Sequence, residues 1–223
     1  MKLFIDSSDL DEIKEALSYG CISGVTTNPT TMARAGVSMY GRIREISELA
    51  IDKPVSAQIT TLDRVEGQGQ AALLGEIRPN VVVKVPVTPT GLRICGTSSS
   101  ESRFNVTLVF SAAQAIVAAN CGAWCVSPFL CRWKDWKWNN QHESQGKRDA
   151  GREFLKSIVN AVRGTHCQVL AASLRSVEDV EDAIEAGCDI ATVSLPLLRQ
   201  MMQHRKTDEG LAKFMADWAA AKQ

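Results

Sequence analysis

The sequence predicts a (β/α)8 TIM barrel with an extra C-terminal helix, built as a single domain over residues 1–223. Eight short β-branched runs recur about 27 residues apart, which is near the length of one strand–helix unit in a parallel α/β fold. The segments between them carry helix signals, and no linker-like stretch divides the chain. A chain of 223 residues suffices for one sizeable core and lies within the range of single-domain barrels. An open doubly wound sheet is the alternative fold, but no G-x-G-x-x-G motif follows any run, which weakens a dinucleotide-binding form of it.

Each predicted strand is an apolar, β-branched run that ends in small or polar residues. The eight strands are predicted at 3–6, 22–29, 55–60, 81–87, 104–110, 123–129, 167–173 and 190–195.

Helix start and stop signals separate these strands. Capping-box patterns begin at Ser8, Ser111 and Ser176. Glycines stand where helices are expected to stop, namely Gly20, Gly122 and Gly187. The stretch 96–103 has little helix pattern, so the fourth helix is expected to be short.

A further helix is predicted at about 207–221, after the eighth strand. Its apolar residues recur at helical spacing and form one stripe: Leu211, Phe214, Met215 and Trp218. This stripe needs a partner, and a neighbouring subunit is one candidate.

Composition and charge favour a cytoplasmic protein that binds neither nucleic acid nor membrane. Lys+Arg and Asp+Glu balance at 25 each, which gives no electrostatic case for a polyanionic partner. The three apolar residues before Asp6 are too few for a signal peptide. The apolar stretch 112–131 is interrupted by polar residues, Gly122 and Pro128, so we interpret it as a buried helix followed by a buried strand.

The cysteines do not form a recognisable pattern. The seven residues are an odd number at irregular spacing, which argues against a disulfide framework. Cys121, Cys125 and Cys131 lie close together, but no second cysteine pair or histidine group stands at ligand spacing. No metal and no cofactor are predicted.

Lys84 is the most informative residue, because it lies inside the apolar strand VVVKVPV. Strands of a parallel barrel are covered on both faces, so a lysine there is desolvated, and this lowers its pKa. A neutral amine is the nucleophile that Schiff-base chemistry on a carbonyl requires. The alternative is a strand-end lysine whose ammonium group reaches water.

Other polar residues lie in or just after the predicted strands, where a barrel has its active site. They are Asp6, Thr26, Thr27, Asn28, Gln58, Asn105, Thr107, Ser127 and Ser173. Asp6 is the only acid among them and is therefore the candidate proton shuttle. Arg132, after the sixth strand, and Ser173 with Arg175, after the seventh, suit a phosphate dianion. Each residue alone has a structural explanation as a cap, turn or surface side chain.

The motifs FIDSS, GVTTNPT, VVVKVPVT, FNVTLVFSAAQA, VSPFLCR and AASLRS resemble the transaldolase family in its short form, which includes the fructose-6-phosphate aldolases. The similarity runs from Lys2 to about Trp218. It implies a (β/α)8 barrel, a metal-free class I aldolase mechanism, sugar-phosphate substrates and a homo-oligomer, pentamer or decamer, in which the C-terminal helix reaches a neighbour.

The resemblance also implies roles for individual residues. Lys84 matches the Schiff-base lysine and Asp6 the acid/base aspartate, while Thr107 and Gln58 match the pair that holds the catalytic water. The remaining matches are substrate-binding: Asn28, Thr26, Asn105, Ser127 and Phe129 in the sugar site, and Arg132, Ser173 and Arg175 in the phosphate site.

Two branches of the family remain open. Phe129 and Asn105 favour a transaldolase, whereas Gln58 is the residue typical of the aldolase branch. A sugar-phosphate-binding barrel without turnover is a third hypothesis. Cys131 replaces a usual glycine before Arg132. The tryptophan-rich stretch 131–148 is expected to be a variable loop whose rings pack locally, with a lid or subunit contact as the alternative.

Overall fold

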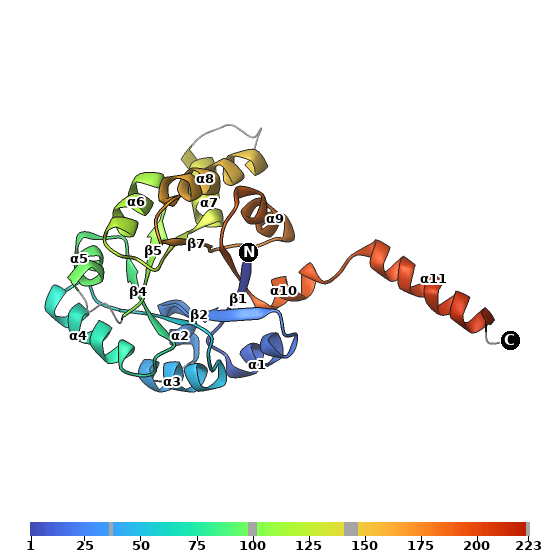
Figure 1. The fold of residues 1–223 in the computed structure, drawn as a ribbon, viewed down its shortest axis with the longest axis horizontal. Coiled ribbons are helices and arrows are strands. Elements are labelled where there is room, and N and C mark those ends of the chain that lie inside the picture. The colour runs from blue at the N-terminus through green and yellow to red at the C-terminus, as the bar shows by residue number, and fades with distance from the viewer. Residues whose placement is uncertain (36–37, 98–101, 141–146, 222–223) are drawn as a thin grey trace.

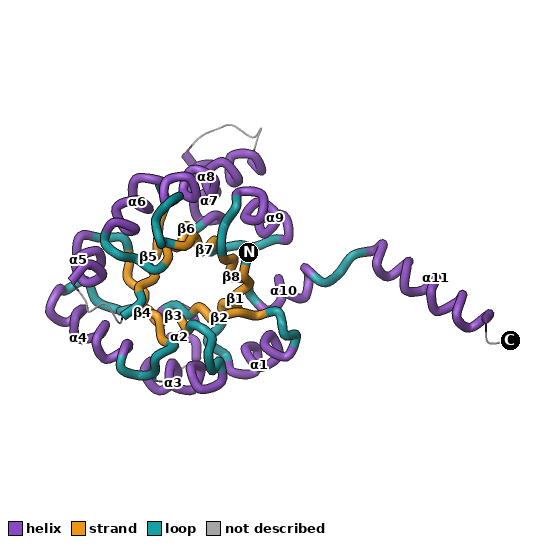
Figure 2. Tube along the Cα trace, viewed as in Figure 1, coloured by secondary structure: helices purple, strands orange, loops and turns teal. Residues whose placement is uncertain are grey.

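The structure, a computed structural model, describes residues 1–35, 38–97, 102–140 and 147–221. Its centre is a closed barrel of eight parallel strands in sequential order, so the predicted TIM barrel is confirmed (Figure 1, Figure 2). Closure pairs β1 with both β2 and β8, so every strand has two neighbours. The strands are β1 (Lys2–Asp6), β2 (Ile22–Thr26), β3 (Val55–Gln58), β4 (Val81–Pro86), β5 (Phe104–Val109), β6 (Cys125–Pro128), β7 (Gln168–Ala171) and β8 (Ile190–Val193).

Helices form a ring around the barrel (Figure 2). They are α1 (Leu10–Ser18), α2 (Pro29–Ala35), α3 (Met39–Leu49), α4 (Arg64–Gly75), α5 (Pro89–Thr97), α6 (Ala112–Asn120), α7 (Leu130–Asn140), α8 (Lys147–Val162), α9 (Val177–Ala186) and α10 (Leu195–Met201). A further helix, α11 (Arg205–Ala221), lies outside this ring. The weak stretch 96–103 meets the end of α5 at Thr97, and residues 98–101 lie outside the described residues.

Most of the predicted helix boundaries are confirmed. The Ser111 hydroxyl caps α6, and Ser176 forms a capping box with Asp179 at α9. Gly20, Gly122 and Gly187 all have positive φ at or after helix ends. The prediction for Ser8 was wrong, because the carboxylate of Asp9 caps α1 and accepts from the backbone N–H groups of the first turn.

The tryptophan-rich stretch is not a loop where the structure describes it. Residues 130–140 form α7, α8 begins at Lys147, and 141–146 lie outside the described residues. The local ring packing is confirmed, since the Trp133 ring stacks on Phe154 of α8 at a centroid distance of 4.5 Å. That contact gives α7 an apolar anchor on its neighbour, which explains why a segment with a weak amphipathic pattern is helical.

The core has two parts. A large cluster fills the space between strands and helices, and a small one lies inside the barrel, with Phe4, Cys125, Leu170, Ala172 and Ile190. Gly24 belongs to this arrangement, because a methyl group built on it would overlap the Phe4 ring. The ring therefore occupies the space that a larger residue on β2 would take.

α11 extends away from the barrel (Figure 1). Over its described length none of its residues is buried, and Phe214 of the predicted stripe is 71% exposed. No helix in the described part of the chain combines the length and the apolar character needed to span a membrane.

Candidate active site

Lys84 points into a cavity of about 310 Å³ at the carboxyl ends of the strands. All six residues of β4 are buried, and Lys84 is only 5% exposed. Its Nζ donates a hydrogen bond to the backbone carbonyl of Thr27 at 3.2 Å. The amine is thus held inside the barrel and does not reach bulk water.

Burial lowers the pKa of Lys84 below that of an exposed lysine, and the positive charge of Arg132 lowers it further. The nearby carboxylate of Asp6 acts in the opposite direction, but burial is the largest of the causes. Since only the neutral amine has a free lone pair, this environment increases the fraction of Lys84 that can attack a carbonyl carbon.

Asp6 ends β1 and also lines the cavity. Thr26, its register partner on β2, donates to Asp6 Oδ1 at 3.0 Å. The Thr26 hydroxyl also lies 2.6 Å from the hydroxyl of Thr192 on β8. The carboxylate is therefore fixed by a chain of hydroxyls drawn from the two strands beside it.

Neighbouring strands bring further polar groups to the level of Lys84. Gln58 on β3 and Asn105 on β5 are its register partners, and Gln58 lines the cavity. Asn105 is fully buried, donates to the Ser56 hydroxyl at 3.2 Å and accepts from the Ser127 hydroxyl at 2.6 Å. These two bonds fix the orientation of its amide.

Thr107 lies two residues beyond Asn105 on β5, beside Ser127 of β6. It is fully buried, and its hydroxyl has no hydrogen-bond partner within the part of the chain that the structure describes. Because an unpaired buried hydroxyl is unfavourable, it is a candidate to bind a small polar molecule.

Arg132, Ser173 and Phe129 line the side of the cavity next to β6 and β7. The guanidinium of Arg132 lies 5.0 Å from the Phe129 ring centroid, a cation–π distance that restricts its position. Ser173 has φ +60, in the left-handed region. A positive side chain and a hydroxyl thus face the same space as Lys84, which suits an anionic end of a ligand.

Three of the predicted site residues do not line this cavity: Asn105 and Thr107 are fully buried, and Arg175 is placed elsewhere. Its guanidinium forms two hydrogen bonds, of 3.1 and 2.7 Å, with Asp135 of α7, and its side chain is 58% exposed. Asn28 does line the cavity, but through the loop between β2 and α2, since β2 ends at Thr26 and not at residue 29.

Comparison with known proteins identifies the family of this chain. The profile of the family described as "Transaldolase/Fructose-6-phosphate aldolase" matches residues 3–223. The chain belongs to this family.

Curated relatives within the transaldolase/fructose-6-phosphate aldolase family match over almost their whole length. "Probable transaldolase 1" of Bacillus anthracis is 41% identical over 221 residues, which are 98% of this chain and 97% of the relative. "Probable transaldolase" of Dehalococcoides mccartyi is 42% identical over 222 residues, 98% of each chain. The namesake from Clostridioides difficile is 39% identical over 224 residues, 99% of this chain and 98% of the relative. The chain is thus similar to proteins named as transaldolase-type enzymes.

A solved structure supports the fold alone. The thiamine phosphate pyrophosphorylase from Pyrococcus furiosus aligns with a TM-score of 0.57 over 86% of this chain and 85% of that one. At 18% identity, this similarity concerns the barrel and not its chemistry.

Several residues in or beside this family member's site were not singled out from the sequence, among them Ser56, Leu108 and Thr192. Ser56 and Thr192 are polar residues inside strands, the same signal that identified Asn105 and Thr107. Leu108 lines the cavity with φ +60, at an irregularity in the pairing of β5 with β6. A left-handed leucine is unfavourable and is typical of functional sites, but no sequence signal marks it.

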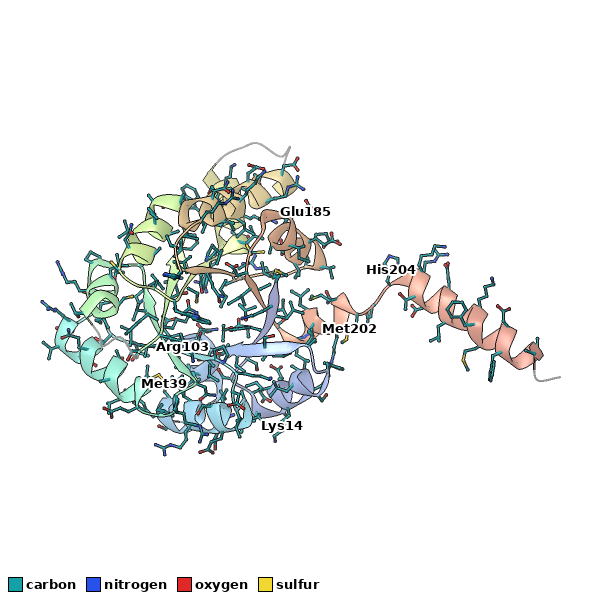
Figure 3. All side chains as sticks on the ribbon, viewed as in Figure 1. Lys14, Met39, Arg103, Glu185, Met202 and His204 are labelled. Atoms are coloured by element: carbon teal, nitrogen blue, oxygen red, sulfur yellow. The ribbon has the colours of Figure 1, made fainter. Side chains whose placement is uncertain are left out.

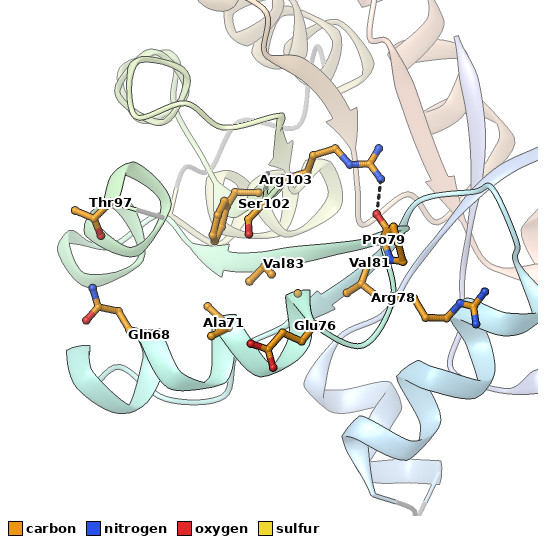
Figure 4. Close-up of a pocket in the computed structure, with 13 residues that line it drawn as sticks. Gln68, Ala71, Glu76, Arg78, Pro79, Val81, Val83, Thr97, Ser102 and Arg103 are labelled. Atoms are coloured by element: carbon orange, nitrogen blue, oxygen red, sulfur yellow. Dashed lines mark hydrogen bonds between the residues drawn. The ribbon is translucent and has the colours of Figure 1, made fainter. Parts of the chain in front are cut away.

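A larger cavity of about 700 Å³ lies on the outside of the barrel between α4 and α5 (Figure 4). It is bordered by the amino-terminal halves of β4 and β5, including Val81, Val83 and Phe104. Active sites of TIM barrels lie at the opposite ends of the strands, so the smaller cavity around Lys84 is the candidate active site. Among the described residues, no group of three or more His, Cys, Asp or Glu is placed to hold a metal ion.

Proposed function

We propose that the protein is a transaldolase, which moves a dihydroxyacetone unit from a ketose phosphate to an aldose phosphate through a Schiff base on Lys84. Sedoheptulose 7-phosphate and fructose 6-phosphate are the proposed donors. The observation that carries the proposal is Lys84 itself, a buried amine with a lowered pKa beside Asp6 in a cavity at the barrel mouth. Family membership and the names of the relatives support the coarser assignment to transaldolase-type enzymes.

The proposed reaction begins with imine formation. The lone pair of Lys84 Nζ attacks C2 of the donor, and the carbonyl oxygen takes up a proton. The carbinolamine then loses that oxygen as water. Asp6 exchanges these protons through a water molecule held by Thr107 and Gln58. The buried and unpaired hydroxyl of Thr107 supports this role.

Bond cleavage follows from the imine. Asp6 takes the proton of the C4 hydroxyl, the C3–C4 bond breaks, and its electrons form an enamine with the iminium as electron sink. An aldose phosphate leaves, and the three-carbon unit stays on Lys84. In the transfer step the enamine carbon attacks the aldehyde of the acceptor, whose oxygen takes the proton back from Asp6. Water finally hydrolyses the imine and releases the new ketose phosphate.

The remaining residues are proposed to bind the substrate. Asn28 and Ser127, which line the cavity, are proposed to hydrogen-bond sugar hydroxyls together with Asn105, which accepts from the Ser127 hydroxyl. Thr26 is proposed to orient Asp6. Arg132 and Ser173 are proposed to bind the phosphate, with Phe129 beneath the guanidinium. Arg175 is proposed to join them after exchanging its Asp135 partner for the phosphate.

Gln58 favours a second candidate function, a fructose-6-phosphate aldolase. In that reaction the enamine is protonated and hydrolysed to dihydroxyacetone and no acceptor is needed. An amide at this position holds water differently from a carboxylate, because it donates as well as accepts. Gln58 lines the cavity next to Lys84, where such water would lie.

The acceptor requirement separates the candidate functions. The protein is incubated with fructose 6-phosphate, with and without erythrose 4-phosphate, and glyceraldehyde 3-phosphate is followed. A transaldolase releases it rapidly only when the acceptor is present, whereas an aldolase releases it without acceptor. No release in either arm would favour the non-catalytic sugar-phosphate-binding barrel.

Borohydride reduction tests the covalent step by itself. A Schiff base formed from fructose 6-phosphate is reduced to a stable amine, and peptide mass spectrometry locates it. We expect the modification on Lys84 and on no other lysine. Modification elsewhere, or none, would contradict both enzymatic proposals.

We also propose that the protein is a homo-oligomer, a pentamer or decamer, in which α11 packs on a neighbouring copy. Support comes from the exposed apolar residues of α11, which stand apart from the barrel beyond Met202 and His204 (Figure 3). Light scattering after size-exclusion chromatography tests this. Phe214→Lys with Trp218→Lys should reduce the molar mass, whereas the exposed control Lys213→Ala should not.

A further inference from the structure

The two chain segments that carry the anion-binding groups lie side by side. Arg132 follows β6 and Ser173 follows β7. The backbone N–H of Leu130 donates to the carbonyl of Ala172 at 3.0 Å, and that of Cys131 donates to the carbonyl of Ser173 at 3.2 Å. The separation of Arg132 and Ser173 therefore depends on how firmly these segments are joined.

Asp179, in the first turn of α9, contacts both segments with one carboxylate oxygen. Its Oδ2 accepts from the backbone N–H groups of Arg175 at 2.9 Å and Ser176 at 3.0 Å. The same oxygen accepts from the Cys131 thiol at 3.1 Å. A capping box needs only the bond to Ser176, so the contacts with Cys131 and Arg175 are additional to the cap.

Lys134 of α7 completes this cluster. Its Nζ donates to Asp179 Oδ1 at 2.7 Å and to Asp182 Oδ2 at 3.1 Å. The stem of Lys134 lies against Gly151 of α8, where a methyl group would overlap it. The network thus connects helices that stand together on one side of the barrel (Figure 1).

The charges of this cluster persist in spite of burial. Burial alone would raise the pKa of Asp179, but the hydrogen bonds from Lys134, the Arg175 backbone and Cys131 lower it overall. Burial raises the pKa of the Cys131 thiol to about 12, so that it remains a donor. Buried ion pairs contribute little net stability, and a role in fixing geometry accounts better for such a costly arrangement.

We propose that Asp179, held by Lys134, is a positioning residue that sets the spacing between Arg132 and Ser173 and so prepares the site for the phosphate of the substrate. The proposal deepens the proposed function and rests on it for the identity of the anion. Cys131, the residue before Arg132, has a role in the same arrangement. Its thiol donates to the Asp179 carboxylate, which also binds the backbone of the segment after β7.

A pair of substitutions at Asp179 separates the hydrogen bonds of its side chain to the backbone from the effect of its charge. Asp179→Asn keeps an oxygen that can accept from the segment N–H groups but loses the ion pair. Asp179→Ala loses both. Asp63→Ala is the matched control, because Asp63 caps α4 through the Glu66 N–H and does not line the cavity.

Two ligands provide the readouts. Calorimetry measures binding of inorganic phosphate, and borohydride trapping measures capture of dihydroxyacetone, which has no phosphate. For Asp179→Ala we expect phosphate binding to weaken on the order of tenfold, because displaced groups lose oriented contacts, while trapping of dihydroxyacetone on Lys84 is unchanged. Asp179→Asn should bind phosphate within about threefold of the unmodified protein. The Asp63→Ala control should match the unmodified protein in both readouts.

The outcomes distinguish this proposal from the proposed function. Equal phosphate affinity in Asp179→Ala and the unmodified protein would overturn the positioning role. Absence of trapping in the unmodified protein would overturn the Schiff-base function, while a selective loss of phosphate binding in Asp179→Ala would still support positioning. If Asp179→Ala does not fold, Cys131→Ala removes the thiol contact with Asp179 and leaves both the Lys134 ion pair and the α9 cap intact. Phosphate binding should then weaken about threefold, and unchanged binding would again contradict the proposal.

Discussion

The lower and upper layers of the barrel interior differ sharply, although they lie on the same faces of the same strands. Along three strands the inward residue changes from apolar to polar within two positions, from Phe4 to Asp6, from Cys125 to Ser127 and from Ile190 to Thr192. The lower layer is a packed floor, and the upper layer is a set of hydrogen-bonded donors and acceptors around a cavity.

The floor also affects the environment of Lys84. Phe4 and Ile190 are at most 1% exposed, so they exclude water from the lower barrel. Burial is the main cause of the lowered pKa of Lys84, which stands among polar neighbours in the upper layer. The apolar floor thus adds to the burial that lowers the pKa of Lys84.

Removing the amine should have the largest effect. Lys84→Met keeps an unbranched stem of similar length in the cavity but cannot form an imine. We expect the release of glyceraldehyde 3-phosphate to fall at least about a thousandfold, since the covalent intermediate is lost. Circular dichroism should show an unchanged fold, and residual activity within tenfold of the original would contradict the role of Lys84.

A methyl group in the lower layer should have the next largest effect. Gly24→Ala would force a carbon against the Phe4 ring, and overpacking of this kind costs about 1–3 kcal/mol of unfolding free energy. Gly69→Ala on α4 is the control, because no heavy atom lies within 4 Å of the added carbon. Urea denaturation measures both.

A rescue variant identifies the contact responsible. Phe4→Leu removes part of the ring that the added methyl group overlaps, so Gly24→Ala with Phe4→Leu should be more stable than Gly24→Ala alone. Strictly additive losses would show that the Phe4 ring is not the obstacle.

Much of this contrast could be predicted from the sequence. Buried parallel strands are apolar on both faces, so eight β-branched runs indicated the barrel, and polar residues within them indicated the site. Lys84, Asp6, Gln58 and Ser127 were found in this way, and all of them line the cavity.

Features that depend on distant partners could not be predicted. Lys134 and Asp179 are 45 positions apart, and neither has a local pattern that pairs them. The contact of Arg175 with Asp135 spans 40 positions. The left-handed conformations of Leu108 and Ser173 are imposed by surrounding structure, since neither residue favours them.

The pH dependence of the unfolding free energy tests directly whether the Lys84 amine is desolvated. Between its lowered folded pKa and the value of an exposed lysine, about 10.4, the unfolded chain binds a proton that the folded chain lacks. Unfolding free energy therefore rises with pH in that window, by up to about 1.4 kcal/mol per pH unit. Below the folded pKa the lysine is charged in both states, and the full cost of burying the charge is present.

Lys84→Met removes this contribution. We expect the variant to be more stable than the original protein near neutral pH, by an amount that shrinks as the pH approaches 10.4. Urea titrations of both proteins at a series of pH values measure the difference. A difference that does not change with pH would show that the amine is not desolvated by the floor.

The smallest effect is expected from the hydrogen-bond chain of the upper layer. Thr26 has a single hydroxyl hydrogen, which it donates to Asp6, so the bond between Thr26 and Thr192 requires Thr192 to be the donor. Thr192→Val keeps the shape and removes that donor. Loss of one such bond costs about 1 kcal/mol, so we expect kcat to fall severalfold with little change in KM. The exposed Thr97→Val should leave both constants unchanged. An unchanged kcat in Thr192→Val would mean that this hydroxyl only satisfies a buried partner. A selective fall in kcat would mean that the upper layer orients Asp6 for proton transfer, a role that the packed floor below it cannot supply.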